Sequence, residues 1–500
     1  MRSIFSSILR LEVGIAVVPA LALALAFPKA NFGWLAPLAA AGLFWLWQDL
    51  PWKRAFWSGW FAGCVFFAVN YAWFTYTVGA LVGNLAFVVV LGPAVLNGAY
   101  VGVAAALAAL AYRRAPKATA PLAAAAAFPI LEWLRSIGPV GVPFAQLGYT
   151  QVQTPLAVFA AYIGSYGVTF IICLLGAYLA DAIRYRNNVR LGYCVASLVL
   201  LWIAAWLAWP ARHMQAPTMR VAAIQGDIAQ AVKFDKPGQH EALRHAVQRY
   251  TALSQKAAAF HPELVVWPET VIPTTLSADG KLSARFGALA QRLDTTLLVG
   301  SQDFHDDAAY NALFVYGRTG ALLGVYDKRQ LVPFAESFPA KRWLGWLPYA
   351  SLITGYGHGT LDSVYPARLP FAPLICWESA FADLAHAQLR AGAKLFVVST
   401  DDAWFGETAG PYAHAKIAQM RAIEAGTWIV RAASTGISGI IAPDGRYVRA
   451  SDMNTEAIVV GSVGTPPGSV FASLGPTFIC LVLCGVYCAV LLSARARPGA

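Results

Sequence analysis

The chain has 500 residues, of which 58% are hydrophobic and only 13% are charged, whereas an average soluble domain carries about a quarter charged residues. This composition excludes an ordinary soluble protein and indicates a membrane protein with room for one soluble domain, since a span needs only about 20 apolar residues. The net charge of +11 does not indicate a nucleic-acid partner, because the basic residues form no block and stand mostly beside apolar segments.

Eight apolar segments predict a helical bundle that crosses the membrane eight times. The second and the fifth are short for a full crossing, and the fourth is long enough to tilt or to bend at Pro93. In chain order, the segments lie at residues 11–27, 33–48, 55–77, 81–112, 119–134, 156–180, 190–209 and 472–493.

The basic residues predict the orientation of these spans, because lysine and arginine favour short cytoplasmic loops. With the N-terminus inside, the inner segments carry twelve basic residues and the short outer loops carry only Lys29 and Arg135. Both termini are therefore expected in the cytoplasm. Residues 1–210 would form a seven-span membrane domain, 211–470 an outward-facing domain, and 471–500 the eighth span with a short tail. The twelve are Arg2, Arg10, Lys53, Arg54, Arg113, Arg114, Lys117, Arg184, Arg186, Arg190, Arg495 and Arg497.

Two features of the membrane part have more than one interpretation. The first 26 residues have the basic start and apolar core of a cleavable signal peptide. Because further spans follow in a continuous series, we expect a retained signal anchor. Glu132 is the main charge inside a predicted span, where it can pair with Arg135 one turn on or have a functional role.

From Met219 onward, short β-rich runs alternate with helical stretches, a pattern typical of an α/β domain of about 250 residues. In such domains, active-site groups collect where strands end. Strands are expected within 219–226, 263–269, 295–301, 321–328, 371–378, 394–400, 427–434 and 456–462, and helices within 240–259, 281–293, 379–392 and 412–426.

Three of these strands end in Glu269, Lys328 and Cys376. Alone, each residue has an ordinary explanation as a helix cap, a surface charge or a buried thiol. Together they form a complete catalytic set, because a mostly protonated thiol needs a base or a cation beside it. Glu269 can take the proton, while Lys328 and the amide after the cysteine can stabilise an oxyanion. The set predicts acyl transfer through a thioester.

Cys376 is the only one of seven cysteines outside the apolar segments, so no disulfide is expected within the outward domain. The others behave as small hydrophobic residues in apolar helices. No metal-ligand spacing and no phosphate-binding glycine loop is found, so we expect no metal and no cofactor. The six are Cys64, Cys173, Cys194, Cys480, Cys484 and Cys488.

The motifs "WPET", "YDKRQLVPFAESFP" and "LICWESAF" carry the three residues in this order. They resemble the Glu-Lys-Cys signature of the nitrilase superfamily, and the eight-span frame resembles the apolipoprotein N-acyltransferase family over nearly the whole chain. "VAAIQGDIAQAVKF" and "DDAWFGETAGPYAHAKIAQMRAIE" are also similar to that family. The resemblance implies an α-β-β-α sandwich in the periplasm, anchored in the bacterial inner membrane.

The same resemblance implies roles for the motif residues. Glu269 would be the general base, Lys328 the oxyanion and thiolate stabiliser, and Cys376 the nucleophile. Glu336 would hold Lys328 or the substrate amine, unless it is an exposed loop carboxylate. Glu378 would touch the site or begin the following helix, where the dipole favours a carboxylate. Trp377, which follows the cysteine, would supply the amide of the oxyanion site.

The resemblance implies a ping-pong reaction with two lipid substrates. Cys376 would take an acyl chain from a membrane phospholipid, and the α-amine of a diacylglyceryl-modified N-terminal cysteine of an apolipoprotein would then remove it. One alternative is a membrane-tethered amidase, for which a single anchor would suffice. Another is a non-catalytic membrane scaffold or transporter with a nitrilase-like domain, which predicts that a triad residue is lost, although all three are present.

Because both substrates are lipids, the site is expected to open at the bilayer surface. The aromatic segment 341–357 suits an interfacial position, and the glycine-rich segment 404–414 suits a mobile lid. Segment 144–151 can contribute to the entrance. An ordinary packed loop is an equal alternative for the first two and the safer interpretation of 144–151. His414 is interpreted as contact or packing. The proposed contact residues are Phe234, Trp343, Trp346, Tyr349, Trp404 and His414.

Overall fold

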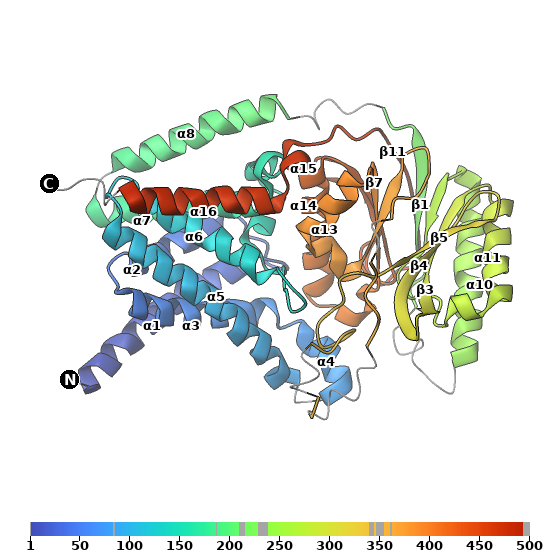
Figure 1. Ribbon diagram of the computed structural model, residues 1–500, viewed down its shortest axis with the longest axis horizontal. Coiled ribbons are helices and arrows are strands. Elements are labelled where there is room, and N and C mark those ends of the chain that lie inside the picture. The colour runs from blue at the N-terminus through green and yellow to red at the C-terminus, as the bar shows by residue number, and fades with distance from the viewer. Residues whose placement is uncertain are drawn as a thin grey trace.

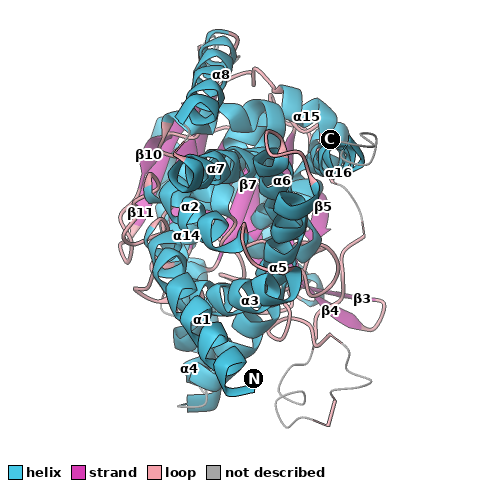
Figure 2. Cartoon of the chain, turned by 90° about the vertical axis from the view of Figure 1, so that its left-hand side faces the viewer, coloured by secondary structure: helices cyan, strands magenta, loops and turns pink. Residues whose placement is uncertain are grey.

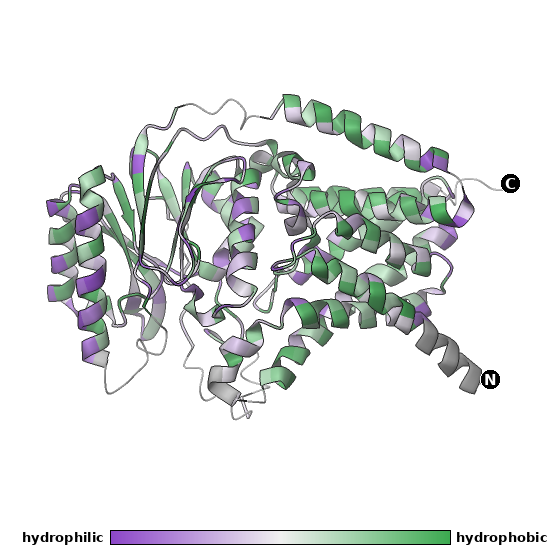
Figure 3. Cartoon of the chain, turned by 180° about the vertical axis from the view of Figure 1, so that it is seen from behind, coloured by the Kyte–Doolittle hydropathy of each residue, from purple (hydrophilic) through white to green (hydrophobic). Residues whose placement is uncertain are grey.

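The computed structural model of the protein describes residues 2–493 apart from 84–85, 187, 210–215, 229–238, 340–344, 347–354 and 361–362. A bundle of helices lies beside an α/β part, and the last helix, α16, returns to the bundle (Figure 1). Seen from the bundle side, the strands lie behind the helices (Figure 2). Apolar residues dominate the bundle, whereas polar residues face outward on the far helices of the α/β part (Figure 3).

A long helix lies in each of the eight predicted segments, but some bounds differ: α1 begins earlier than predicted and α16 begins later. The third segment ends earlier than expected, and the short helix α4 separates it from α5. The helices are α1 (Arg2–Leu25), α2 (Leu35–Trp47), α3 (Trp52–Asn70), α4 (Phe74–Val82), α5 (Ala86–Arg114), α6 (Ala120–Arg135), α7 (Ala160–Tyr185), α8 (Asn188–Leu207) and α16 (Pro476–Ser493).

Four stretches within the described residues are long and apolar enough to cross a membrane. They are Ala86–Arg114, Pro155–Tyr185, Asn188–Leu207 and Pro476–Ser493. Small residues allow close packing in the bundle, as in other membrane helices. A Cβ atom on Gly63 of α3 would lie 2.8 Å from the Cα of Gly98 in α5. These two helices therefore approach each other backbone to backbone.

Glu132 and Arg135 bind different partners, although they lie one turn apart on α6. Glu132 accepts hydrogen bonds from the Leu147 amide at 2.8 Å and from the Thr169 hydroxyl at 2.7 Å. Arg135 donates to the carbonyl of Phe144 at 2.8 Å and also to that of Val142. A loop that leaves the bundle needs partners for its backbone polar groups. The two charges therefore hold segment 142–147 in place.

The α/β part consists of two stacked sheets, and the predicted α/β domain is confirmed. The six-stranded sheet has the order β11-β1-β2-β3-β4-β5, and the five-stranded sheet has the order β10-β9-β8-β7-β6. The strands are β1 (Met219–Gln225), β2 (Leu264–Val266), β3 (Thr296–His305), β4 (Ala308–Tyr316), β5 (Leu322–Asp327), β6 (Phe371–Ile375), β7 (Leu395–Thr400), β8 (Trp428–Ala433), β9 (Gly439–Ile441), β10 (Tyr447–Ala450) and β11 (Ala457–Val463).

Helices cover the outer faces of both sheets, which gives four layers. Helices α10 (Gln239–Ala257) and α11 (Gly280–Arg292) pack on the six-stranded sheet, and α13 (Ala382–Arg390) and α14 (Gly410–Ala425) pack on the other. Apolar side chains from both sheets fill the space between them, among them Val266 of β2. Because both faces of the central strands are buried, these strands are apolar throughout rather than alternating.

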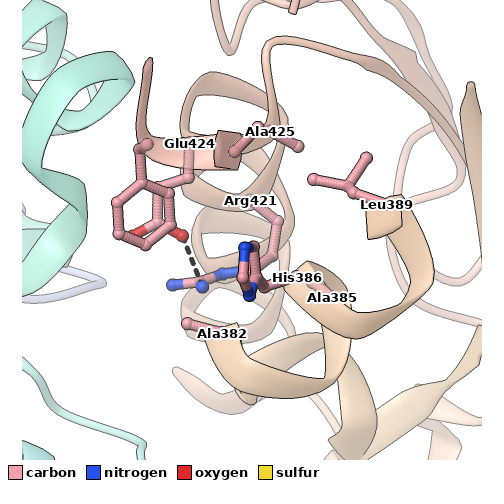
Figure 4. A pocket seen from close by; sticks show the side chains of 9 residues that line it. Ala382, Ala385, His386, Leu389, Arg421, Glu424 and Ala425 are labelled. Atoms are coloured by element: carbon pink, nitrogen blue, oxygen red, sulfur yellow. Dashed lines mark ion pairs between the residues drawn. The ribbon is translucent and has the colours of Figure 1, made fainter. Parts of the chain in front are cut away.

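Helix α14 also contacts the bundle through a buried ion pair. Arg421 is paired with Glu424 one turn later, and His386 lies beside this pair in a small cavity (Figure 4). Glu424 accepts a hydrogen bond of 2.5 Å from the Ser165 amide of α7. Arg421 donates to the Tyr149 hydroxyl at 3.4 Å. The charges of α14 therefore join the α/β part to the bundle.

We predict that Arg421→Met destabilises the protein by about 3–5 kcal/mol, because Glu424 is left buried without its partner. Thermal unfolding of the purified protein in detergent measures this as a lower Tm. Arg421→Met combined with Glu424→Leu should recover most of the loss, because no buried charge remains. An equal Tm for the single variant and the wild type would contradict the structural role of the pair.

Candidate active site

Cys376 begins a single turn of 3-10 helix, η8 (Cys376–Ala380), directly after β6. Its φ angle is +49°, a left-handed conformation that is uncommon for residues other than glycine. Such conformations cost about 1–3 kcal/mol and cluster at functional sites, where the surrounding structure enforces them. The cysteine is 7% exposed and is therefore buried.

Two glutamates hold the ammonium of Lys328 next to this turn. The Lys328 Nζ lies 2.9 Å from Glu269 Oε1 and 2.8 Å from Glu336 Oε1. The lysine side chain is 1% exposed. Although burial disfavours its charge, Glu269 and Glu336 raise the pKa of Lys328 well above its ordinary value. Lys328 is therefore a permanent cation, and Glu336 is part of the cluster rather than an exposed loop carboxylate.

Asn311 of β4 joins the same cluster, and the sequence analysis missed it. Its side-chain amide donates to Glu269 Oε1 at 2.7 Å and to Glu336 Oε1 at 2.8 Å. The Asp401 amide donates to the other oxygen of Glu269 at 2.8 Å. A polar amide in the middle of an apolar run, "AAYNALFVY", was the available signal. The strand itself, β4, was not predicted.

The position of Glu269 requires a glycine on the neighbouring strand. Glu269 lies in the loop after β2, and Gly300 of β3 lies against that loop. A Cβ atom on Gly300 would lie 2.8 Å from the Cα of Glu269. Because real side chains essentially never come this close, any other residue here would displace the carboxylate from Lys328.

The surroundings of Cys376 keep its thiol protonated at rest. Burial raises the pKa of Cys376 well above that of a free thiol, and Glu269 raises it further, while Lys328 acts in the opposite direction. The thiolate is the nucleophilic form of cysteine. A base must therefore take the thiol proton when a substrate arrives, and Glu269 is the carboxylate whose charge the thiol experiences most.

Glu378 joins the strand ends that carry Lys328 and Cys376. One oxygen accepts a hydrogen bond from the Arg329 amide at 2.6 Å, and the other accepts from the Ile375 amide at 2.7 Å. Burial raises the pKa of Glu378 to about 7, against the effect of these hydrogen bonds. The predicted helix at 379–392 begins only at Ala382, so Glu378 holds the two loops rather than starting that helix.

Aromatic rings form the bundle side of the site. Trp377 stacks on Phe144 with ring centroids 4.8 Å apart and planes at 14°. Phe144 also lies 5.7 Å from Trp73, whose ring meets Phe405 edge to face at 4.8 Å. Segment 144–151 therefore contacts the residue after the cysteine.

The proposed contact residues are not gathered in one place. His414 lies behind Cys376, with its Nε2 atom 3.0 Å from the cysteine carbonyl oxygen. Trp404 belongs to a segment packed against α4, where the Thr77 hydroxyl donates to its carbonyl at 2.7 Å. Trp346 is 77% exposed. The predictions for Phe234, Trp343 and Tyr349 concern positions outside the described residues.

One group of side chains among the described residues has the spacing of a metal site. The ligand atoms of Asp303, His305 and Asp327 lie within 4.8 Å of one another. However, both ring nitrogens of His305 already meet carboxylates, Asp306 at 3.1 Å and Asp327 at 3.0 Å. The hydrogen bonds of His305 to Asp327 and to its neighbour Asp306 thus account for the position of the ring.

Two family models match the chain. The model described as carbon-nitrogen hydrolase matches residues 220–464. The model described as apolipoprotein N-acyltransferase N-terminal domain matches residues 20–178. The two matches therefore cover the α/β part and most of the helical bundle.

Proteins of several bacteria are similar to this chain over most of its length. Apolipoprotein N-acyltransferase of Geobacter metallireducens is 32% identical over 516 residues, which covers 99% of this chain and 97% of that protein. The protein of the same name from Pseudomonas aeruginosa is 33% identical and covers 86% and 85%, respectively. That from Coxiella burnetii is 28% identical and covers 90% and 93%. The chain therefore belongs to the apolipoprotein N-acyltransferase family.

Proposed function

We propose that this protein transfers a fatty acyl chain from a membrane phospholipid to the α-amine of the diacylglyceryl-modified N-terminal cysteine of apolipoproteins. One observation supports this most directly: a strained, buried Cys376 lies beside the Glu269–Lys328–Glu336 cluster, where α/β part and apolar bundle meet. Family membership supports the same reaction, because the similar proteins are named for it.

In the first step, Cys376 Sγ bonds to the acyl carbonyl carbon of the phospholipid while Glu269 takes the thiol proton. The carbonyl oxygen becomes an oxyanion, which the Lys328 ammonium and the Trp377 amide stabilise; such donors contribute a few kcal/mol. When the intermediate collapses, the ester C–O bond breaks. Glu269 returns the proton to the departing lysophospholipid oxygen, and a Cys376 thioester remains.

In the second step, the α-amine of the apolipoprotein cysteine attacks the thioester carbonyl and Glu269 accepts an amine proton. The C–S bond breaks, the amide forms, and the Cys376 thiolate recovers its proton from Glu269. Glu336 keeps Lys328 charged and in place through both steps. Water competes with the amine, and the aromatic contacts around Trp377 and Phe144 suit its exclusion.

The same proposal includes a membrane arrangement. Eight spans would place both termini in the cytoplasm and the α/β part in the periplasm of a bacterial inner membrane. Residues 1–210 would form the membrane domain, 211–470 the catalytic domain, and 471–500 the last span and tail. The part of segment 404–414 that precedes α14 would act as the lid, and the entrance would lie beside Phe144, where lipids reach the site from the bilayer.

Acyl transfer can be measured with a phospholipid of defined acyl chains and a synthetic diacylated lipopeptide. The wild-type protein should add a third acyl chain to the free α-amine, detected by mass spectrometry, and leave an N-acetylated lipopeptide unchanged. Cys376→Ala should form no product, because the acyl carrier is lost. Release of free fatty acid alone would instead indicate a hydrolase, and product formed by Cys376→Ala would contradict the mechanism.

Asn311→Leu should lower kcat about tenfold or more, because a hydrogen bond to a charged group contributes about 1.5–3 kcal/mol. The variant removes the side-chain amide that donates hydrogen bonds to both Glu269 and Glu336. Gln248→Leu is the matched control, since Gln248 is an exposed side-chain amide on α10, which packs on the outer face of the six-stranded sheet. Equal kcat values for Asn311→Leu and the control would contradict the role of Asn311.

A further inference from the structure

Lys416 is a buried lysine on α14 that the two steps above do not use. It is 7% exposed. Its ammonium donates a hydrogen bond to the side-chain carbonyl of Asn31, in the loop between α1 and α2. Within the described part of the chain, no carboxylate forms an ion pair with this ammonium. Because burial of a charge without a counter-charge is costly, an anion that reaches Lys416 would be stabilised there.

The electrostatics of Lys416 agree with this lack of a counter-charge. Burial lowers the pKa of Lys416 to about 8, and no carboxylate of the described residues raises it again. Lys328 is the contrast, since two carboxylates raise the pKa of that buried lysine well above its ordinary value. An ammonium carries three donor protons. Among the described residues, Asn31 is the one acceptor that Lys416 meets, so two donors remain for a ligand.

A second lysine approaches the same face of α14. Lys29, in the loop that carries Asn31, lies over the ring of Tyr412, with its Nζ atom 5.9 Å from the ring centroid. Tyr412 comes one turn before Lys416, so the two side chains share a face of the helix. The loop between α1 and α2 thus brings two ammonium groups to one edge of α14.

The polar groups around these lysines leave both ammonium groups able to bind an anion. Lys29 donates to the backbone carbonyl of Glu407 at 2.8 Å. The carboxylate of Glu407 has another partner, the side-chain amide of Asn454, at 2.9 Å. The Asn31 side chain donates to Gln153 at 2.8 Å, which is an uncharged contact.

The loop between α1 and α2 has the composition of a segment at a bilayer surface. Phe32 and Trp34 are 48% and 63% exposed, and their ring centroids lie 6.3 Å apart. Exposed aromatic residues beside lysine are typical of the interface between membrane and water. The helices on either side of the loop are apolar. A phospholipid beside these helices would therefore present its phosphate near Lys29 and Lys416.

We propose that Lys29, Asn31 and Lys416 form a binding site for the phosphate group of a membrane phospholipid, separate from the site around Cys376. His414, two residues before Lys416, is the residue of α14 that meets the Cys376 carbonyl. Residues two apart on a helix do not face each other, so the two sites lie on different sides of α14. Lysine binds phosphate as a compact cation, and basic residues at the membrane surface attract anionic lipids.

The proposed site has a structural consequence that is independent of acyl transfer. Asn31 holds the Lys416 ammonium at the edge of the protein, and a phosphate would supply the missing counter-charge. Because Lys416 belongs to the α/β part and Lys29 to the bundle, a lipid held by both would fasten the two parts at the bilayer surface.

The test is the binding of a phosphatidylglycerol with two ether-linked chains to the purified full-length protein, measured by native mass spectrometry in neutral detergent. Ether-linked chains cannot be transferred to Cys376, so binding is measured without reaction. The wild type should bind this lipid more tightly than the dialkylglycerol that lacks the phosphate. Lys416→Gln should raise the apparent Kd of one bound lipid about fivefold or more. Lys416→Arg keeps the charge and should bind like the wild type.

Lys256→Gln, at an exposed position on α10, is the matched control and should also follow the wild type. Equal binding by Lys416→Gln and the wild type would overturn the proposal, and so would equal binding of the dialkylglycerol. Inorganic phosphate that displaces the lipid at the same concentration would overturn the lipid as the ligand, because the chains would then contribute nothing.

Lys29→Gln gives the decision if Lys416→Gln does not fold, because Lys29 is exposed. It should weaken the same binding about fivefold, and unchanged binding would overturn the proposal. A wild type that binds the ether lipid but forms no lipopeptide product would contradict the proposed function alone. Failure of this inference is therefore distinct from failure of that function.

Discussion

The contact between the Lys328 ammonium and two carboxylates is the interaction on which the rest of the site depends. A cation with a 1% exposed side chain persists only beside compensating charge, and Glu269 and Glu336 supply it. The two carboxylates in turn need donors, which Asn311 and the Asp401 and Val332 amides provide. Because all these groups surround one buried charge, β4, the end of β5 and three loops meet around Lys328.

The bundle is joined to this point through charges of its own. Glu132 and Arg135 hold segment 142–147, and Phe144 in that segment stacks on Trp377, next to Cys376. Arg421 and Glu424 make the second junction, between α14 and α7. Because α14 also carries His414, the helix that meets the bundle is the one that contacts the cysteine backbone. Helix α14 therefore contacts both the apolar bundle and the backbone of the proposed nucleophile.

Much of the fold and part of the site could be predicted from the sequence. Apolar runs of the length of a helix or strand are local signals, so the long helices and eight of the strands were found. Glu269, Lys328 and Cys376 were found because each follows such a run. The break before α4 was missed, because residues 71–73 are as apolar as the helices beside them. Strand β4 was missed along with Asn311.

The partners of His414 could not be predicted, because they depend on folding. Asp402 lies 12 residues before it and Arg431 lies 17 residues after it, on separate elements. Helix α14 is buried along nearly its whole length, so its sequence shows no polar face that would single out one histidine. Only the three-dimensional packing shows that Asp402, Arg431 and the carbonyl of Cys376 surround the ring.

The central claim is that Cys376 carries the acyl chain as a thioester. The most direct measurement is the intact mass of the purified protein after incubation with dipalmitoyl phospholipid and no acceptor. The account predicts an adduct of one palmitoyl group that hydroxylamine removes and that is absent in Cys376→Ala. No adduct on the wild type, or an adduct that persists in Cys376→Ala, would contradict it.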